Sequence, residues 1–157
     1  MEFLRSRSDL TNFTLYDTAV ANCGTGRKFR PDVLYVLSDR YVILEIDEHE
    51  HKYYCAVAEF DRLQEIRDEL GEHESGKYCV VVRFNPNQPH REVDEMHAEL
   101  ERMLRDAFVT GDVVNAETGV LTRYLGYSSK RQGEIIRDVE MRTTAEFESA
   151  KRASVAQ

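Results

Sequence analysis

The 157 residues suffice for one domain with a buried core, and a hydrophobic content of 41% excludes a wholly disordered chain. The net charge of −8 argues at first against a nucleic-acid partner. The excess is local, however: eleven acidic side chains stand against three basic ones between residues 44 and 75, and the rest of the chain carries 18 of each.

No apolar run is long enough for a membrane span, and the N-terminus lacks the apolar segment of a secretory signal. The three cysteines are widely separated and form no CxxC pair, which favours free thiols over disulfides or a structural zinc site. We therefore expect one intracellular domain over residues 1–157, with a core at about 13–109 and a C-terminal extension at about 115–157.

The first half of the chain predicts a hairpin followed by a helix. Residues 13–16 fit either a short strand or a helix end. The β-branched and aromatic residues of 32–37 and 41–47 predict two strands, joined antiparallel by a tight turn at 38–40. Apolar residues spaced by three and four predict a helix over 56–70, which Gly71 is placed to end.

The second half continues with a strong strand pattern at 77–84 and an amphipathic helix at 92–108. Residues 119–127 predict a short strand or a turn, and 133–150 predict a last helix. Its apolar stripe of Ile135, Ile136, Val139 and Phe147 suits either DNA recognition or a dimer interface. This order predicts an α/β domain with a mixed β-sheet and flanking helices.

Acidic residues gather at one end of the predicted hairpin. Glu45 and Asp47 are two apart in a strand and so share a face, and the hairpin sets Asp32 against about residue 46 or 47. Three converging carboxylates repel one another unless a cation such as Mg²⁺ or Mn²⁺ neutralises them. Such a site suits phosphodiester hydrolysis, with His51 as general acid or base and Lys52 stabilising developing charge.

A purely structural interpretation stands beside this one. An acidic strand end is often only solvated, and Glu48, His49 and Glu50 are expected to face solvent. Arg62 and Arg83 would then form internal salt bridges with Glu59 or Glu45. Cys55 and Cys79 are expected to be small buried residues, and Met96 and Met103 to pack in the core.

The run Arg30-Pro-Asp-Val with Glu45-Ile-Asp-Glu-His-Glu-His51 resembles the R-x-D…E-x-D-x-x-x-H signature of Vsr-like nucleases in the PD-(D/E)XK superfamily, closest to endonuclease-like proteins of large DNA viruses. Further agreement comes from Glu59, Arg62 and the stretch Val82-Arg-Phe-Asn-Pro86, so the resemblance covers about residues 30–87. It implies a restriction-endonuclease-like core and intracellular action, in the cytoplasm or nucleus of a host cell. A related bacterial group shares the resemblance, so a virus-encoded protein is one of the two origins that it allows.

By position, the resemblance makes Asp32 and Glu45 metal ligands and puts Asp47 where many relatives have a lysine. It gives His51 a part in activation, Glu59 and Arg62 a role in orienting the site, and Arg83 and Asn85 contact with DNA or with the acids. Glu50 replaces a neutral amide and is expected to make the approach of a phosphate less favourable.

The function predicted is therefore a Mg²⁺- or Mn²⁺-dependent DNA endonuclease that hydrolyses phosphodiester bonds, of the nicking, the homing or mobile-element, or the repair type. The basic residues expected to contact DNA are Arg27, Lys28, Arg30, Arg123, Lys130 and Arg131. A paired double-strand cut would need two sites and hence a homodimer, whereas one site would nick. The alternatives are a catalytically inactive DNA-binding or protein-interaction module on a nuclease fold, and an RNA-processing nuclease.

Overall fold

The computed structural model describes residues 2–5, 7, 10, 15–16, 20–21, 28–51, 55–73, 77–109 and 120–137. A five-stranded sheet has the order β1-β4-β5-β6-β7, and β2 and β3 form a separate pair. The strands are β1 (Leu15–Tyr16), β2 (Val20–Ala21), β3 (Lys28–Phe29), β4 (Val33–Val36), β5 (Arg40–Ile46), β6 (Tyr78–Phe84) and β7 (Val120–Leu125). The helices are α1 (Glu2–Arg5), the one-turn η1 (Glu48–His51), α2 (Ala56–His73) and α3 (Val93–Val109), and residues 129–137 are also helical.

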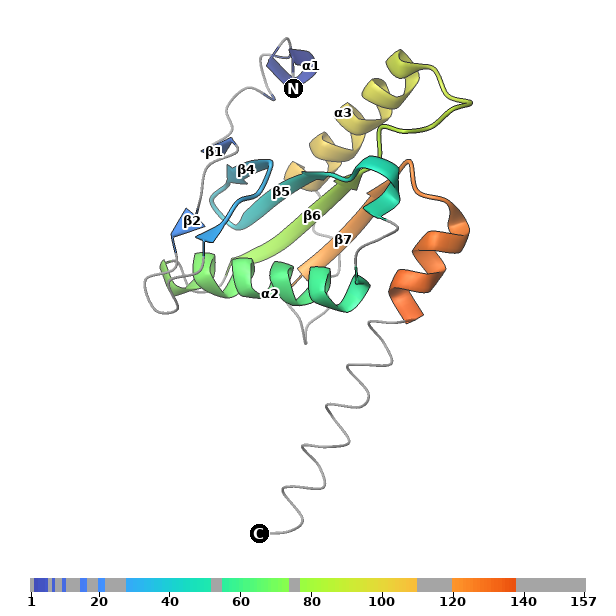
Figure 1. Ribbon diagram of the computed structural model, residues 1–157. Helices are drawn as coiled ribbons and strands as arrows, with labels where there is room; N and C mark the ends of the chain where they lie inside the picture. Colours follow the sequence, from blue (N-terminus) through green and yellow to red (C-terminus); the bar gives the residue numbers. More distant parts are fainter. Residues whose placement is uncertain are drawn as a thin grey trace, which may run out of the picture.

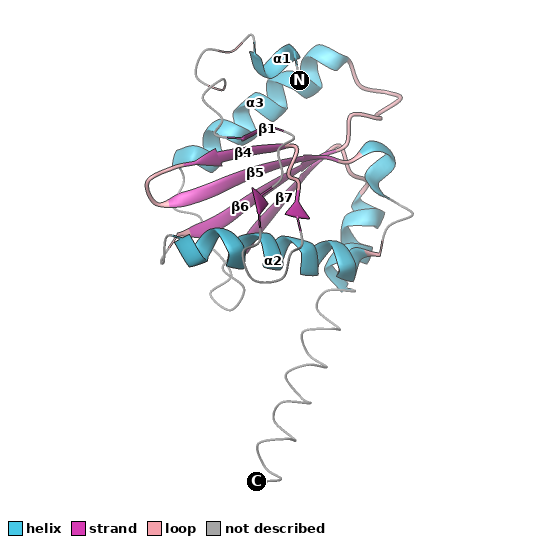
Figure 2. Cartoon of the chain, turned by 60° about the vertical axis from the view of Figure 1, so that its left-hand side comes forward, coloured by secondary structure: helices cyan, strands magenta, loops and turns pink. Residues whose placement is uncertain are grey.

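The sheet is mixed, as the sequence predicted. β1, β4 and β5 pair antiparallel, whereas β5, β6 and β7 pair parallel. Each parallel pair needs a crossover, and α2 links β5 to β6 while α3 links β6 to β7. Figures 1 and 2 show the result, with α3 on one face of the sheet and α2 on the other. The fold is thus a three-layer α/β arrangement, and within the described residues no helix has the length and apolar character to cross a membrane.

Two hydrophobic clusters hold the layers together, one on each face. Leu44 and Val82 point toward α3 and pack with its buried residues Met96, Leu100 and Leu104. Their neighbours in the strands point the other way, and these meet the apolar face of α2. That second cluster contains Leu34, Tyr41, Ile43, Leu63, Ile66, Leu70, Cys79, Val81 and Val120. Burial on both faces explains why β6 reads as an unbroken apolar run.

Several predicted boundaries were wrong for identifiable reasons. Gly71 does not end α2, which continues to His73, and the Tyr41 hydroxyl donates to the Leu70 carbonyl (2.9 Å) in its last turns. The last helix begins before Gly133, because the Ser128 side chain caps it by accepting the N–H of Arg131 (3.2 Å). Residues 120–125 form a strand, and of 13–16 the described part is the strand β1.

The side-chain expectations for the core were met except at one position. Cys79 is buried, and Met96 and Met103 pack in or against the cluster facing α3. Cys55 is exposed, because it precedes α2 instead of lying on its apolar face. Of the apolar stripe expected in the last helix, Ile135 is buried and Ile136 is half exposed. Val139 and Phe147 lie beyond the described residues.

Gly126, which follows β7, is expected to tolerate no side chain. Its φ is +77°, and a Cβ there would lie 2.3 Å from the Asn85 carbonyl oxygen. Gly126→Ala should therefore destabilise the fold by about 2 kcal/mol or more, measured by urea denaturation. Gly133→Ala is the matched control, since a Cβ at that helical position meets nothing within 4 Å. It should be neutral or stabilise by up to about 1 kcal/mol, and equal effects of the two substitutions would contradict the strained geometry at Gly126.

Candidate active site

Acidic residues from two strands meet at one edge of the sheet. β5 and β6 are parallel, so their carboxyl ends lie together, and β4 runs antiparallel, so its start reaches the same edge. Because Val33 pairs with Leu44, residue 32 lies opposite Glu45 and not opposite 46 or 47 as the sequence suggested. The cause is an earlier start of β5, since the Leu37 N–H already bonds the Arg40 carbonyl (2.9 Å).

Glu45 is a buried carboxylate with one satisfied oxygen. Its side chain is 7% exposed, and Oε2 lies 2.8 Å from Nη2 of Arg62. Oε1 is buried and has no hydrogen-bond partner among the described residues. Burial raises the pKa of Glu45 to about 7, Arg62 opposes the rise, and the charges of Asp32 and Asp47 add to it. The folded protein therefore holds an acid that resists ionisation near neutral pH.

Asp32 is the second carboxylate at this edge. Its Oδ2 accepts the N–H of Ile46 (2.7 Å), which fixes the side chain against β5. Partial burial raises the pKa of Asp32; the Ile46 hydrogen bond opposes the rise, and the negative charges of Asp47 and Glu48 add to it. Two neighbouring acids that both resist ionisation form a site whose charge a bound cation would neutralise.

Asp47 was predicted as the third metal ligand, but other side chains already bind its carboxylate. It is fully buried, and its carboxylate receives Arg83 through Nε (2.5 Å) and Nη2 (2.9 Å). The Tyr127 hydroxyl also donates to its Oδ2 (2.5 Å). Both oxygens are thus occupied. No group of three or more His, Cys, Asp or Glu side chains within the described ranges is arranged to hold a metal ion.

A series of ion pairs, in which arginines and acids alternate, connects Asp47 to Glu45 in space. Nη2 of Arg83 also lies 3.1 Å from Glu59, Nε of Arg62 lies 3.7 Å from the same carboxylate, and Arg62 then reaches Glu45. Burial disfavours the charged form of Arg83, yet Asp47 and Glu59 more than offset this and raise its pKa. The structural interpretation of Arg62 and Arg83 as internal salt-bridge partners is therefore confirmed, with Asp47 as an additional acid.

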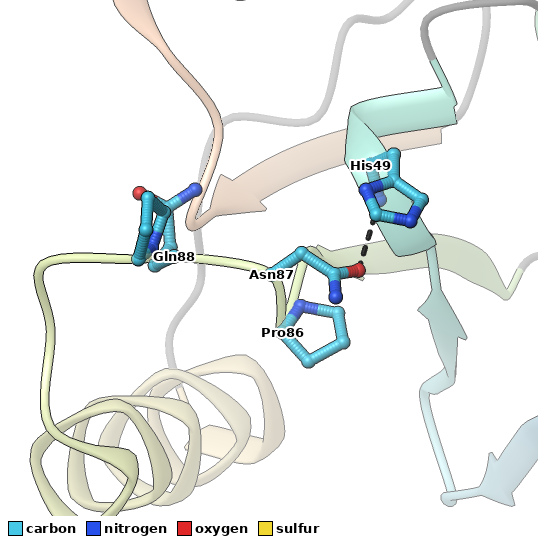
Figure 3. A pocket seen from close by; sticks show the side chains of 5 residues that line it. His49, Pro86, Asn87 and Gln88 are labelled. Atoms are coloured by element: carbon cyan, nitrogen blue, oxygen red, sulfur yellow. Dashed lines mark hydrogen bonds between the residues drawn. The ribbon is translucent and has the colours of Figure 1, made fainter.

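Asn85 has a structural role at the end of β6. It is 1% exposed, its Nδ2 donates to the Gly126 carbonyl (2.8 Å), and its Oδ1 accepts the N–H of Asn87 (3.0 Å). These bonds shape the loop that follows, where Pro86, Asn87, Gln88 and Pro89 form a pocket of about 440 Å³ with His49 (Figure 3). The N–H of His49 donates to Asn87 Oδ1 (3.1 Å), which joins η1 to this loop.

The turn after β5 has an uncommon backbone conformation. His49 (φ 57°, ψ 33°) and Glu50 (φ 59°, ψ 21°) are both left-handed, and neither is glycine. Each such residue costs about 1–2 kcal/mol. Glu48 and His49 are exposed as expected, whereas Glu50 is half-buried against residues 128–131 and does not simply face solvent. The side chains of His51 and Lys52 lie outside the described residues.

The basic residues predicted to contact DNA have different surroundings. Arg30 is exposed, and the Lys130 side chain is 87% exposed, 3.9 Å from Glu134. Arg123 is partly buried. Arg131 is 13% exposed and engages Glu134 and the Glu50 carbonyl, so it serves an internal contact. Arg27 and the side chain of Lys28 are not among the described parts of the chain.

Tyr127 and Ser128 belong to this region but were absent from the sequence-based site. Tyr127 is 80 positions from Asp47 and Ser128 is 78 positions from Glu50, and no local spacing links either pair. The fold and the site together define an α/β protein with a two-carboxylate site at the edge of a mixed sheet. Comparisons with protein-family models, with curated proteins and with solved structures find no match.

In the metal-free protein, Glu45 is expected to make stability fall as the pH rises. Its pKa is raised from 4.5 to about 7 in the folded chain. Its contribution to stability is therefore full below about pH 4.5 and is lost as the pH rises through about 7. The shift corresponds to about 3 kcal/mol. Urea denaturation in EDTA measures the free energy of unfolding at pH 4 and at pH 8. From pH 4 to pH 8, Glu45→Gln should lose about 3 kcal/mol less of this free energy than wild type. An equal loss in both proteins would contradict the buried ionisation.

Proposed function

We propose that the chain is a divalent-metal-dependent nuclease that hydrolyses phosphodiester bonds in DNA, with the cation bound by Asp32 and Glu45. One observation carries the proposal: Glu45 Oε1 is buried, beside a second carboxylate, without a hydrogen-bond partner among the described residues. A buried acceptor without a donor is costly, and a bound cation would satisfy it. Mg²⁺ commonly takes one or two carboxylates and completes its shell with water and substrate phosphate, so this pair fits the ion without Asp47.

The surrounding residues would divide the remaining work. When bound, the cation would polarise the phosphoryl oxygen and acidify a water molecule. Arg62 orients Glu45, and its side chain is 27% exposed, so its charge would also stabilise negative charge on a phosphate bound beside Glu45. Arg83 neutralises Asp47 and so removes one negative charge from the substrate's approach.

The resemblance of residues 30–87 to Vsr-like nucleases of the PD-(D/E)XK superfamily supports the same reaction. By that resemblance, His51 would transfer protons as general acid or base, and Lys52 would stabilise charge that develops on the phosphate. Of the basic residues predicted to contact DNA, Arg30 and Lys130 are exposed and would be able to contact phosphates. Asp32, Glu45 and Glu48 place several negative charges at the site, and a bound cation would offset part of them.

Supercoiled plasmid incubated with Mg²⁺ or Mn²⁺ is expected to be nicked or linearised, and EDTA should prevent this. Nicked product would indicate a single working site, and direct linearisation would indicate paired sites in a homodimer. The same assay on mismatched and branched duplexes covers the other DNA forms. Inertness on all of these would overturn the proposal, and cleavage of RNA but not DNA would replace it with RNA processing.

A non-catalytic DNA-binding or protein-interaction module is the second candidate. It is favoured by the engagement of Asp47 with Arg83 and Tyr127, which leaves two carboxylates where three were expected. This candidate predicts that the wild-type chain shifts labelled duplex DNA in a gel, or captures a protein, without any metal-dependent cut. The plasmid assay and a binding assay on the same preparation separate the two functions.

A further inference from the structure

The left-handed turn after β5 is held by contacts from a distant part of the chain. The Glu50 carboxylate accepts the Ser128 N–H (2.7 Å) at Oε1 and the Ser128 hydroxyl (3.1 Å) at Oε2. Nε of Arg131 also donates to the Glu50 carbonyl (3.4 Å). Side chain and main chain of the same strained residue are therefore both bonded to residues 128–131.

The other side of this contact is a helix N-terminus. Residues 129–137 are helical, and the Ser128 hydroxyl that donates to Glu50 also accepts the N–H of Arg131 (3.2 Å). The Glu50 carboxylate thus lies where the unpaired N–H groups and the dipole of a helix favour a negative charge. The helix is fixed to the sheet in turn, since Ile135 packs with Tyr127 and Tyr124.

We infer that Glu50 is a positioning residue: its carboxylate clamps the left-handed η1 turn to the N-terminus of helix 129–137 and so sets the backbone path from β5 to His51. Left-handed residues other than glycine persist only where the surroundings hold them, and residues 128–131 supply those surroundings. The negative charge of Glu50 is directed at the helix and not at an approaching phosphate.

Amide hydrogen exchange of residues 49–51, followed by NMR on the full chain without metal, tests the clamp. Glu50→Ala should speed this exchange by about tenfold or more. Glu50→Gln should stay close to wild type, because its amide oxygen still accepts the Ser128 N–H. Ser128→Ala should be intermediate, since it removes the hydroxyl contact and keeps the N–H contact. Glu48→Ala, which removes an exposed charge two positions away, is the matched control and should change nothing.

The amides of β6 serve as an internal reference, because uniform acceleration there would report global unfolding and not a local release of the turn. If Glu50→Ala also speeds amide exchange in β6, the clamp is judged from the exchange at residues 49–51 in Ser128→Ala and Glu50→Gln. Exchange at 49–51 that is equal in Glu50→Ala and Glu48→Ala would overturn the clamp. The same holds for Glu50→Gln exchanging as fast as Glu50→Ala, because the bond to the Ser128 N–H that the amide keeps would then not hold the turn.

A kinetic readout rests on the proposed nuclease function. Glu50→Ala should lower kcat about tenfold with KM within about twofold of wild type, since a misplaced catalytic group affects the chemical step more than substrate binding. Glu50→Gln should restore most of the rate. If wild type cuts no DNA, the proposed function fails while the exchange experiment still decides whether the clamp exists.

Discussion

Glu45→Gln is expected to lower the rate of DNA cleavage by more than about 100-fold while the protein stays folded. Even the outer partners of metal ligands are worth about 10–100-fold, so loss of a ligand's charge should cost more. The amide has nearly the same shape as the carboxylate, and it removes an ionisation that the buried site resists. Cleavage rates at saturating Mg²⁺, with Mn²⁺ binding followed by calorimetry, measure both the activity and its cause.

Glu95→Gln is the matched control for this substitution. Glu95 is an exposed acid in the first turn of α3, on the other face of the sheet, and its replacement should leave cleavage unchanged. If Glu45→Gln retains wild-type cleavage and wild-type Mn²⁺ affinity, Glu45 is not a ligand. The carboxylate pair with Asp32 then has no part in the reaction.

Arg83→Ala is expected to cause the largest loss of stability of any substitution considered. Asp47 has no exposed surface and would keep a buried charge without the two guanidinium bonds that now neutralise it. Breaking one partner out of a buried pair costs about 3–5 kcal/mol. Chemical denaturation at pH 7 measures the loss. Adding Asp47→Asn to Arg83→Ala should recover part of it, because the uncompensated charge is then removed.

Arg102→Ala supplies the comparison for an ordinary ion pair. Arg102 and Asp106 are 3.4 Å apart on α3 with side chains 66% and 45% exposed. Exposed pairs of this kind contribute about 0–1 kcal/mol, so the variant should denature close to wild type. A loss for Arg83→Ala no larger than the loss for Arg102→Ala would show that Asp47 is not held as a buried ion.

The main elements were predictable because each has a local cause. Successive side chains of β5 alternate between the two faces of the sheet, and the apolar run of β6 reflects burial on both faces. The convergence of Asp32 and Glu45 followed from the hairpin alone. The bonds of Tyr127 to Asp47 and of Ser128 to Glu50 were not predictable, because Tyr127 and Ser128 are about 80 residues further along the chain and are brought near only by the pairing of β7 with β6.

Other misses came from a local signal that tertiary contacts overrode. Gly71 carries a helix-ending signal, but α2 continues for two residues beyond it to His73, and Tyr41 from the sheet bonds the carbonyl of Leu70 just before Gly71. Ser128 carries a capping signal, five residues before Gly133, the predicted start of the last helix. Glu50 was expected to face solvent because no residue near it in the sequence offers a partner. Its partner is Ser128, the residue that caps the last helix.

The bond between Tyr127 and Asp47 also bears on the order in which the protein matures during synthesis. Asp47 lies in the first third of the chain, and its phenolic partner emerges from the ribosome 80 residues later. Until β7 has paired with β6, Asp47 lacks that bond and the edge of the sheet stays open at β6. A domain folds as a unit, so the bond between Tyr127 and Asp47 forms only after β7 has been synthesised, although Asp32 and Glu45 were made much earlier. Completion of the site is therefore delayed until nearly the whole described fold has been made.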